Sequence, residues 1–216
     1  MTPRRDPRPD IGLRPDLKVV AEWVNPGARV LDVGCGEGAL LAHLAATKAV
    51  DGRGIELSQE GVNACVSHGL AVIQGDADTD LGDYPDDAFD MVILSQTLQA
   101  IRDPRSALIE MLRIGRCAIV SFPNFGHWRA RVELMLRGRV PAATVLGHAW
   151  YETPNIHPCT IRDFIALCRR LDIEILRAVA LGEGGRASAI RGRGGLANLV
   201  GREAIFQLCN GRGAAP

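Results

Sequence analysis

The feature that most constrains this chain is an apolar strand signal that runs directly into a loop with three glycines. Residues 30–38 read VLDVGCGEG, so Asp32 is followed by Gly34, Gly36 and Gly38. A short apolar run indicates a buried strand, and glycines let backbone turn tightly and pass close to a bulky neighbour. A helical pattern of leucines and alanines begins at residue 39. The stretch therefore predicts a strand, loop and helix that place free N–H groups and a positive helix end at the carboxyl edge of a sheet, as in a nucleotide pocket.

Two more acids fall at the predicted ends of later strands. The second strand is predicted at 52–57 and carries Glu56 near its end, and the third, at 70–74, is followed by Asp76. The carboxyl ends of parallel strands meet at one edge of a sheet, where ligands bind. Glu56 therefore stands where a carboxylate could hold the hydroxyls of a ribose. The other acids between 78 and 87 are expected to form a solvated loop face.

The glycine spacing, G-x-G-x-G, differs from the G-x-G-x-x-G of dinucleotide-binding loops. With Asp32 ahead of it, the loop resembles the first motif of the class I S-adenosylmethionine (SAM) methyltransferases. The resemblance implies that SAM or S-adenosylhomocysteine is the ligand, that Asp32 orients the loop or the ligand ammonium, and that Asp76 meets the adenine amino group. A degenerate pocket that keeps the fold and binds nothing is the alternative. The residues assigned to the pocket are Asp32, Gly34, Cys35, Gly36, Gly38, Glu56, Leu57, Asp76, Ala77 and Gln96.

Glutamines follow the fourth predicted strand, at 89–95. Gln96 and Gln99 stand at its carboxyl end, in the region where an open α/β sheet changes strand order and binds ligands. Either side chain could bond the methionine part of a nucleoside ligand, or could simply cap nearby backbone. The sequence leaves both roles open.

Strand and helix signals alternate along most of the chain, which indicates an α/β fold. A helix that opens at Asp16 is expected to cover one face of the sheet. We predict a single-domain, Rossmann-like class I methyltransferase fold over residues 13–210, after a flexible N-terminus at 1–12. Its mostly parallel seven-stranded sheet would end in a C-terminal antiparallel hairpin, with a solvated Gly/Arg-rich connection at 182–195. The seven strands are expected at 29–33, 52–57, 70–74, 89–95, 116–122, 173–181 and 203–209.

Composition narrows the compartment and the class of partner. The chain has 216 residues with 25 basic and 25 acidic side chains, so its net charge gives no electrostatic case for nucleic acid. No apolar run reaches membrane-spanning length, and the Arg- and Pro-rich N-terminus lacks the apolar region of a signal peptide. Four of the six cysteines lie in apolar patterns and are interpreted as reduced core thiols of a cytoplasmic protein: Cys65, Cys117, Cys168 and Cys209.

The segment 123–159 is the least regular part of the predicted domain. It leaves the fifth strand with polar and aromatic residues, continues through an Arg-rich helix at 128–136, and then shows no clear element. A connection this long in a compact domain is usually functional or disordered, and its aromatic content argues against disorder. We interpret it as an insertion that covers the pocket or binds a partner. The partner-binding candidates are Phe125, His127, Trp128, Trp150 and Tyr151.

Several longer stretches resemble the MetW family of methionine biosynthesis proteins. The resemblance spans about residues 14–209 and depends most on SFPNFGHWR at 121–129 and WYETPNIH at 150–157, with support from RPDL at 14–17, SQTLQ at 95–99 and EMLR at 110–113. It implies a role beside a homoserine O-acyltransferase, either an acetyltransferase or a succinyltransferase of the MetX type, in bacterial methionine synthesis. It does not establish that a methyl group is transferred.

No dedicated catalytic machinery is evident. The residues after the fourth strand lack the Asn/Asp-Pro-Pro-Tyr motif of amino-group methylation, and the dipeptide of Pro158 and Cys159 lies in the long loop rather than at a strand tip. His127 is the strong base candidate, with a partner-contact or loop-anchoring role as the alternative. His148, His157 and Cys159 lack the paired spacing of a zinc site, so no metal is expected. Two hypotheses remain: a SAM-binding accessory protein that controls an acyltransferase, and an active methyltransferase on a small metabolite.

Overall fold

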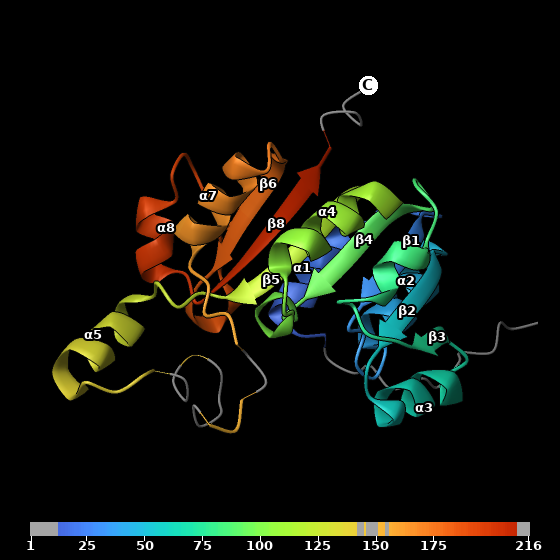
Figure 1. Ribbon diagram of the computed structural model, residues 1–216, viewed down its shortest axis with the longest axis horizontal. Coiled ribbons are helices and arrows are strands. Elements are labelled where there is room, and N and C mark those ends of the chain that lie inside the picture. Colours follow the sequence, from blue (N-terminus) through green and yellow to red (C-terminus); the bar gives the residue numbers. More distant parts are fainter. Residues whose placement is uncertain (1–12, 142–144, 146–150, 154–155, 211–216) are drawn as a thin grey trace, which may run out of the picture.

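The computed structural model describes residues 13–141, 145, 151–153 and 156–210. Eight strands form one sheet in the order β3-β2-β1-β4-β5-β8-β6-β7 (Figure 1). The first five run parallel, β8 is antiparallel to β5, and β6 and β7 continue antiparallel. The strands are β1 (Arg29–Val33), β2 (Asp51–Glu56), β3 (Ala71–Gln74), β4 (Phe89–Ser95), β5 (Gly115–Pro123), β6 (Glu174–Leu181), β7 (Ala187–Ala189) and β8 (Glu203–Cys209).

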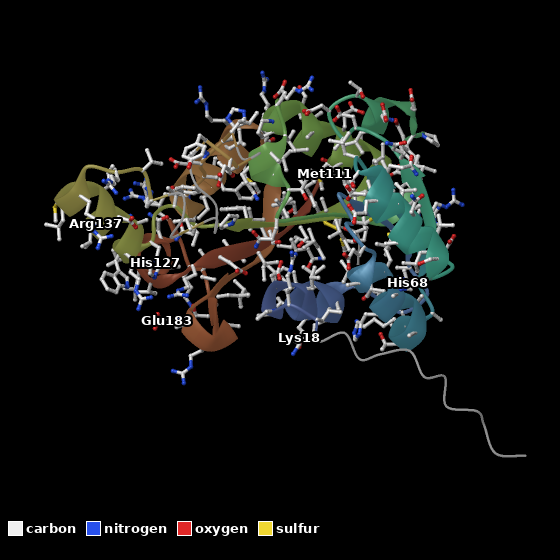
Figure 2. The ribbon with its side chains drawn as sticks, turned by 90° about the horizontal axis from the view of Figure 1, so that it is seen from below. Lys18, His68, Met111, His127, Arg137 and Glu183 are labelled. Carbon is white, nitrogen blue, oxygen red and sulfur yellow. A yellow bond between two sulfur atoms is a disulfide. The ribbon has the colours of Figure 1, made fainter. Side chains whose placement is uncertain are left out.

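Helices cover both faces of the sheet. In Figure 2, α1, which carries Lys18, lies on one side of the strands, and α4, which carries Met111, lies on the other. The α-helices are α1 (Pro15–Trp23), α2 (Ala39–Lys48), α3 (Gln59–Ser67), α4 (Pro104–Ile114), α5 (Trp128–Arg137), α7 (Ile161–Arg170) and α8 (Gly195–Val200). Three short 3₁₀ turns are η1 (Asp80–Asp83), η2 (Leu98–Ala100) and η3 (Glu183–Gly185). No helix in the described ranges is long and apolar enough to cross a bilayer.

Two apolar clusters form the core, one on each face of the sheet. Neighbouring strand residues alternate between them, so Leu31 joins the cluster of α4 and α7 while Val30 joins the cluster of α1 and α2. This alternation is the period of two that a strand imposes on its side chains. Both faces are apolar because helices cover both, which explains the continuous apolar runs in the sequence. The predicted role of the first helix in covering a sheet face is confirmed by its buried residues.

The predicted fold class is confirmed, with one strand more than expected. β6 and β8 pair antiparallel, as predicted for the C-terminal hairpin. The seven-strand count is wrong, because β7 lies within the connection predicted at 182–195 and adds to the edge of β6. α8 then follows, between that connection and β8. β7 consists of three small residues in a glycine-rich setting, so it carries no apolar strand signal.

The prediction of reduced thiols is wrong for two cysteines. Cys117 and Cys209 are paired across β5 and β8, with Cα atoms 4.4 Å apart, and form a disulfide. The spacing is that of directly opposite residues in an antiparallel pair. The other two core cysteines in that prediction, Cys65 and Cys168, are free and buried. Only the register of β8 on β5 brings the two bonded sulfur atoms together.

Candidate functional site

A cavity of about 920 Å³ opens at the carboxyl ends of the parallel strands. Its wall includes Gly34 after β1, Glu56 at the end of β2 and Gln96 after β4. This edge is where open α/β sheets bind ligands. Of the ten predicted pocket residues, the cavity is lined by Gly34, Glu56, Leu57, Asp76, Ala77 and Gln96, whereas Asp32, Cys35, Gly36 and Gly38 are not on its wall.

The three loop glycines all have positive φ, between 56° and 79°, but they have different surroundings. A Cβ on Gly34 would stand 2.7 Å from the hydroxyl of Thr97, and one on Gly38 would collide with Leu70 and Cys65. Both glycines therefore permit close packing of the loop on its own domain. A Cβ on Gly36 would meet nothing within 4 Å. Gly36 is thus the member of the three whose missing side chain leaves open space.

Glu56 joins the glycine loop to the next turn. Its Oε2 accepts a hydrogen bond from the Gly36 N–H at 2.8 Å, and its Oε1 accepts one from the Ser58 N–H at 2.9 Å. A carboxylate has about four acceptor sites. Glu56 can therefore hold the loop and still accept hydrogen bonds from a ligand in the cavity that it lines.

Asp32 is buried behind the loop. Burial raises the pKa of its carboxyl group to about 7; Arg14 lowers the pKa and Glu56 raises it further. Desolvation disfavours the charged form, which is the usual reason for such a shift. The position fits an effect on the loop more directly than a contact with a ligand, because Asp32 does not line the cavity.

The two glutamines after β4 have different surroundings. Gln99 donates from Nε2 to the backbone oxygen of Gln96 at 2.6 Å, so it caps backbone. Gln96 has a φ of 55°, and its buried Nε2 has no hydrogen-bond partner among the described residues. Left-handed backbone in a residue other than glycine and an unpaired buried amide both cost free energy. Gln96 is therefore the glutamine with a donor left over for a ligand.

Sequence reasoning missed a polar cluster at the start of α1. Asp16, only 2% exposed, accepts hydrogen bonds from Arg14 at 3.1 and 3.2 Å, from Ser95 at 3.0 Å and from Ser121 at 3.3 Å. The cluster fixes the start of α1 on the ends of β4 and β5. An acid in a first helical turn is common, so the available signal was weak. Arg202 and Glu203, which also line the cavity, were missed because they lie at the start of an antiparallel strand.

His127 is the N-cap of α5. Its Nδ1 accepts a hydrogen bond from the Arg129 N–H at 3.2 Å, which gives the loop-anchoring interpretation structural support. Burial lowers the pKa of the imidazole, as do Arg202 and Arg129. In Figure 2, His127 lies where α5 joins the body of the protein and Arg137 lies farther out on the helix.

The other partner-binding candidates differ in exposure. Trp128 is 45% exposed, with the Arg129 guanidinium 5.4 Å from the centroid of its ring, and Tyr151 is 71% exposed. Phe125 is half-buried. Trp150 lies outside the described residues, as does His148. Across the described ranges, no three histidine, cysteine or acidic side chains converge as metal ligands would.

The sequence of this chain also matches known proteins. The family described as methionine biosynthesis protein MetW matches residues 14–208. The chain is 38% identical over 175 residues to the bifunctional methionine biosynthesis protein MetXA/MetW of Rhodopirellula baltica, an alignment that covers 77% of this chain and 28% of that protein. It is 27% identical to the ajmaline N-methyltransferase of Rauvolfia serpentina, over 68% of this chain and 53% of the relative. The chain thus spans only about a quarter to a half of these relatives.

A solved structure shares the fold. The SAM-dependent methyltransferase of Thermotoga maritima, described as a possible histamine N-methyltransferase, superposes with a TM-score of 0.67. The match covers 90% of this chain and 87% of the other at 18% identity. At that identity the likeness concerns the fold, which is the one predicted from the glycine loop and the strand-end acids.

Proposed function

The chain belongs to the MetW family of methionine biosynthesis proteins, and from that membership we propose that it is a SAM-binding accessory subunit of a homoserine O-acyltransferase. The observation that carries the proposal is the bifunctional relative, in which a MetXA part and a MetW part share one chain. Parts that are fused in one chain often work on each other. Because the proposed partner is a biosynthetic enzyme, we expect the protein in the cytoplasm.

The cavity suits SAM or S-adenosylhomocysteine by its polar groups. Glu56 would hold the ribose, Asp76 the adenine amino group, and the unpaired Nε2 of Gln96 the methionine part. Gly36 is not on the wall, but its N–H holds the carboxylate of Glu56, which is. When bound, SAM carries a sulfonium methyl group that is reactive toward nucleophiles. Asp32, Cys35 and Gly38 would act from behind the wall by setting the shape of the loop.

The surroundings of His127 favour the accessory role. Because its Nδ1 accepts the Arg129 N–H, the neutral ring carries its proton on Nε2. That nitrogen can donate a hydrogen bond but cannot take a proton from an attacking group. The residue that the sequence offered as a general base is therefore held in the wrong tautomer for that task.

An active methyltransferase acting on a small metabolite is the second candidate. The fold and the ajmaline N-methyltransferase relative favour it, and fold alone does not decide function. A substrate positioned in line with the methyl group could react without a strong base.

We assign the partner surface to the segment 123–159, within a domain of residues 13–210. α5 projects from the body of the protein (Figure 1), and Trp128 lies at its first turn beside Arg129. Exposed aromatic and arginine side chains are typical of interface hot spots. Phe125, His127, Trp150 and Tyr151 complete the proposed surface. The segment also borders the cavity through Arg129 and Val145, so one segment could sense the ligand and contact the partner.

Size-exclusion chromatography with the cognate acyltransferase, with and without SAM, tests the proposal. We expect co-elution, a changed rate of homoserine acylation in the mixture, and a SAM affinity that differs between the free protein and the complex, since coupling of two ligands is reciprocal. A methyl-transfer assay on cell extract runs in parallel. Separate elution in both conditions together with methyl transfer to an extract component would establish the second candidate instead.

A further inference from the structure

The cavity extends beyond the part that the predicted SAM-binding residues line. Its volume of about 920 Å³ is near the top of the usual range for small-molecule sites, about 300–1,000 Å³. The assigned SAM residues cluster at the ends of β1, β2, β3 and β4. A second part of the wall comes from the start of α1, the end of β5, the first turn of α5 and the start of β8, and residues of η2 and Val145 also line the cavity. We call this second part the β5–β8 half.

Two arginines on one wall of the β5–β8 half share a single carboxylate partner. Arg129 and Arg202 both line the cavity, and each places its guanidinium 2.7 Å from the same oxygen, Oε1, of Glu183. One carboxylate therefore serves two guanidinium groups. Each guanidinium has five N–H donors, so both have donors left to bind a planar anion such as a carboxylate. Arginine often binds a carboxylate through two parallel hydrogen bonds. Figure 2 shows Glu183 and His127 at this end of the molecule.

A carboxylate without a partner faces the same space. Glu203, half-buried at the start of β8, lines the cavity, and no described residue gives its side chain a hydrogen bond or ion pair. The pKa of this group is raised by burial and by Asp16, and lowered by Arg14 and Arg202. Asp16 is already satisfied by Arg14 and two serines. Glu203 is thus the group on this wall with acceptors to offer a cation.

We propose that the β5–β8 half binds a free α-amino acid beside the nucleoside ligand, its carboxylate held by Arg129 and Arg202 and its ammonium by Glu203. Arg14 and Asp16 pair with each other, so the remaining charges of this wall are two guanidinium groups and one unpaired carboxylate. Together they complement a zwitterion and match neither a simple anion nor a simple cation. The proposal depends on the proposed SAM site in one respect: SAM would occupy the other half of the cavity, at the ends of β1 to β4. It gives the accessory subunit a means to respond to an amino acid of the pathway as well as to SAM.

Isothermal titration calorimetry on the full chain tests the site. S-adenosylhomocysteine is titrated first, and L-homoserine is then titrated with and without it. Two analogues each lack one charge: 4-hydroxybutyrate has no ammonium, and L-homoserine amide has no carboxylate. We expect L-homoserine to bind with S-adenosylhomocysteine present, and each analogue to bind at least tenfold more weakly.

Charge-neutral variants assign each contact. Arg202→Gln should weaken L-homoserine and 4-hydroxybutyrate at least tenfold but leave the amide unchanged, whereas Glu203→Gln should weaken L-homoserine and the amide and leave 4-hydroxybutyrate unchanged. Arg193→Gln, an exposed arginine away from the cavity, is the matched control. No heat with L-homoserine, or equal binding of all three compounds to the wild type, would overturn the proposal. Failure of S-adenosylhomocysteine alone would instead count against the SAM site.

Discussion

Among single residues, Gly36 combines left-handed backbone with open space beside its Cα atom. We predict that Gly36→Val lowers SAM affinity at least tenfold, about 1.4 kcal/mol, because a branched residue at this positive φ would strain the loop and disturb its hydrogen bond to Glu56, which lines the cavity. Calorimetry measures the effect.

Gly69 provides the matched control for this substitution. It also has positive φ, 73°, and a Cβ added there would meet nothing within 4 Å, but it lies after α3 and away from the cavity. Gly69→Val should show the same backbone strain with unchanged SAM affinity. Equal SAM binding by a folded Gly36→Val variant would remove the loop from the site.

Asp32 should make stability depend on pH. Its pKa in the folded protein is about 7, above its ordinary value of 3.8. Between these values the folded state holds a proton that the unfolded state has lost, so stability falls as pH rises from about 4 to about 7 and levels off above that. The slope contributed by one such group is at most about 1.4 kcal/mol per pH unit. Urea unfolding from pH 5 to 8 should show that Asp32→Asn gains stability relative to wild type as pH rises; parallel curves would contradict the shift.

At the scale of elements, one buried side chain joins four segments. Asn124, after β5, donates from Nδ2 to the carbonyl groups of Asn198 and Gly201, and its Oδ1 accepts from the N–H groups of Gly126 and Ile161. These bonds connect the entries to α5 and α7 with α8 and the turn before β8. The sequence placed Asn124 in a segment expected to cover the pocket or bind a partner, and the structure adds this role as a junction.

We predict that Asn124→Ala lowers the free energy of unfolding by about 3 kcal/mol or more, because it leaves several buried backbone groups unpaired, each worth about 1–3 kcal/mol. Asn63, exposed on α3 and bonded only to Gln59 among the described residues, is the control; Asn63→Ala should change stability by less than about 0.5 kcal/mol. Urea denaturation compares the two. Similar losses at both sites would show that Asn124 is not a junction.

The exposed face of α5 offers a second prediction at this scale. Met135 is 76% exposed, and Met135→Glu would place a charge on the proposed partner surface. We expect association with the acyltransferase to weaken at least tenfold while the melting temperature stays close to wild type, since the side chain packs on little of its own domain. Val66→Glu on α3, 57% exposed and beside the opposite edge of the sheet, should leave association unchanged. If Met135→Glu and Val66→Glu weakened association equally, the interface would not lie on α5.

For the whole molecule, the disulfide between Cys117 and Cys209 closes a loop across 92 residues. Cross-links over loops of this length stabilise mainly by restricting the unfolded chain, with measured effects of about 2–4 kcal/mol. We predict that dithiothreitol lowers the free energy of unfolding by that amount. A Cys117→Ser/Cys209→Ser double variant should have the stability of the reduced protein, and dithiothreitol should not change its free energy of unfolding. Overlapping wild-type curves with and without reductant would mean that the bond contributes nothing.

How far the sequence predicted this molecule depends on whether a signal is local. Runs such as 89–95 predict strands because both faces of the sheet are covered, and the structure has a strand there. The order of strands around the glycine loop was available only through the family resemblance. Pairings between distant segments, such as Cys117 with Cys209 or Asp16 with Ser121, depend on register and packing that no local pattern contains.

The site residues also divide into those with a local signal and those without one. Gly34, Glu56 and Gln96 were found on the cavity wall because each follows directly from the end of a parallel strand. Arg202 and Glu203 were not, since they begin an antiparallel strand whose partner was unknown. Two of the three residues that carry the amino-acid proposal, Arg202 and Glu203, are therefore ones that only the assembled sheet could place.

The sheet has short edges: β3, with four residues, and β7, with three. A long, flat edge strand is a template on which other chains can add, whereas a short one presents few unpaired backbone groups. The β3 edge therefore offers little for strand-to-strand polymerisation to start from, whereas β7 covers only the Val179–Leu181 part of β6. If the proposed partner surface on α5 is right, we expect the protein to exchange between enzyme molecules by the side-chain contacts of one projecting helix, without strand pairing at the β3 edge.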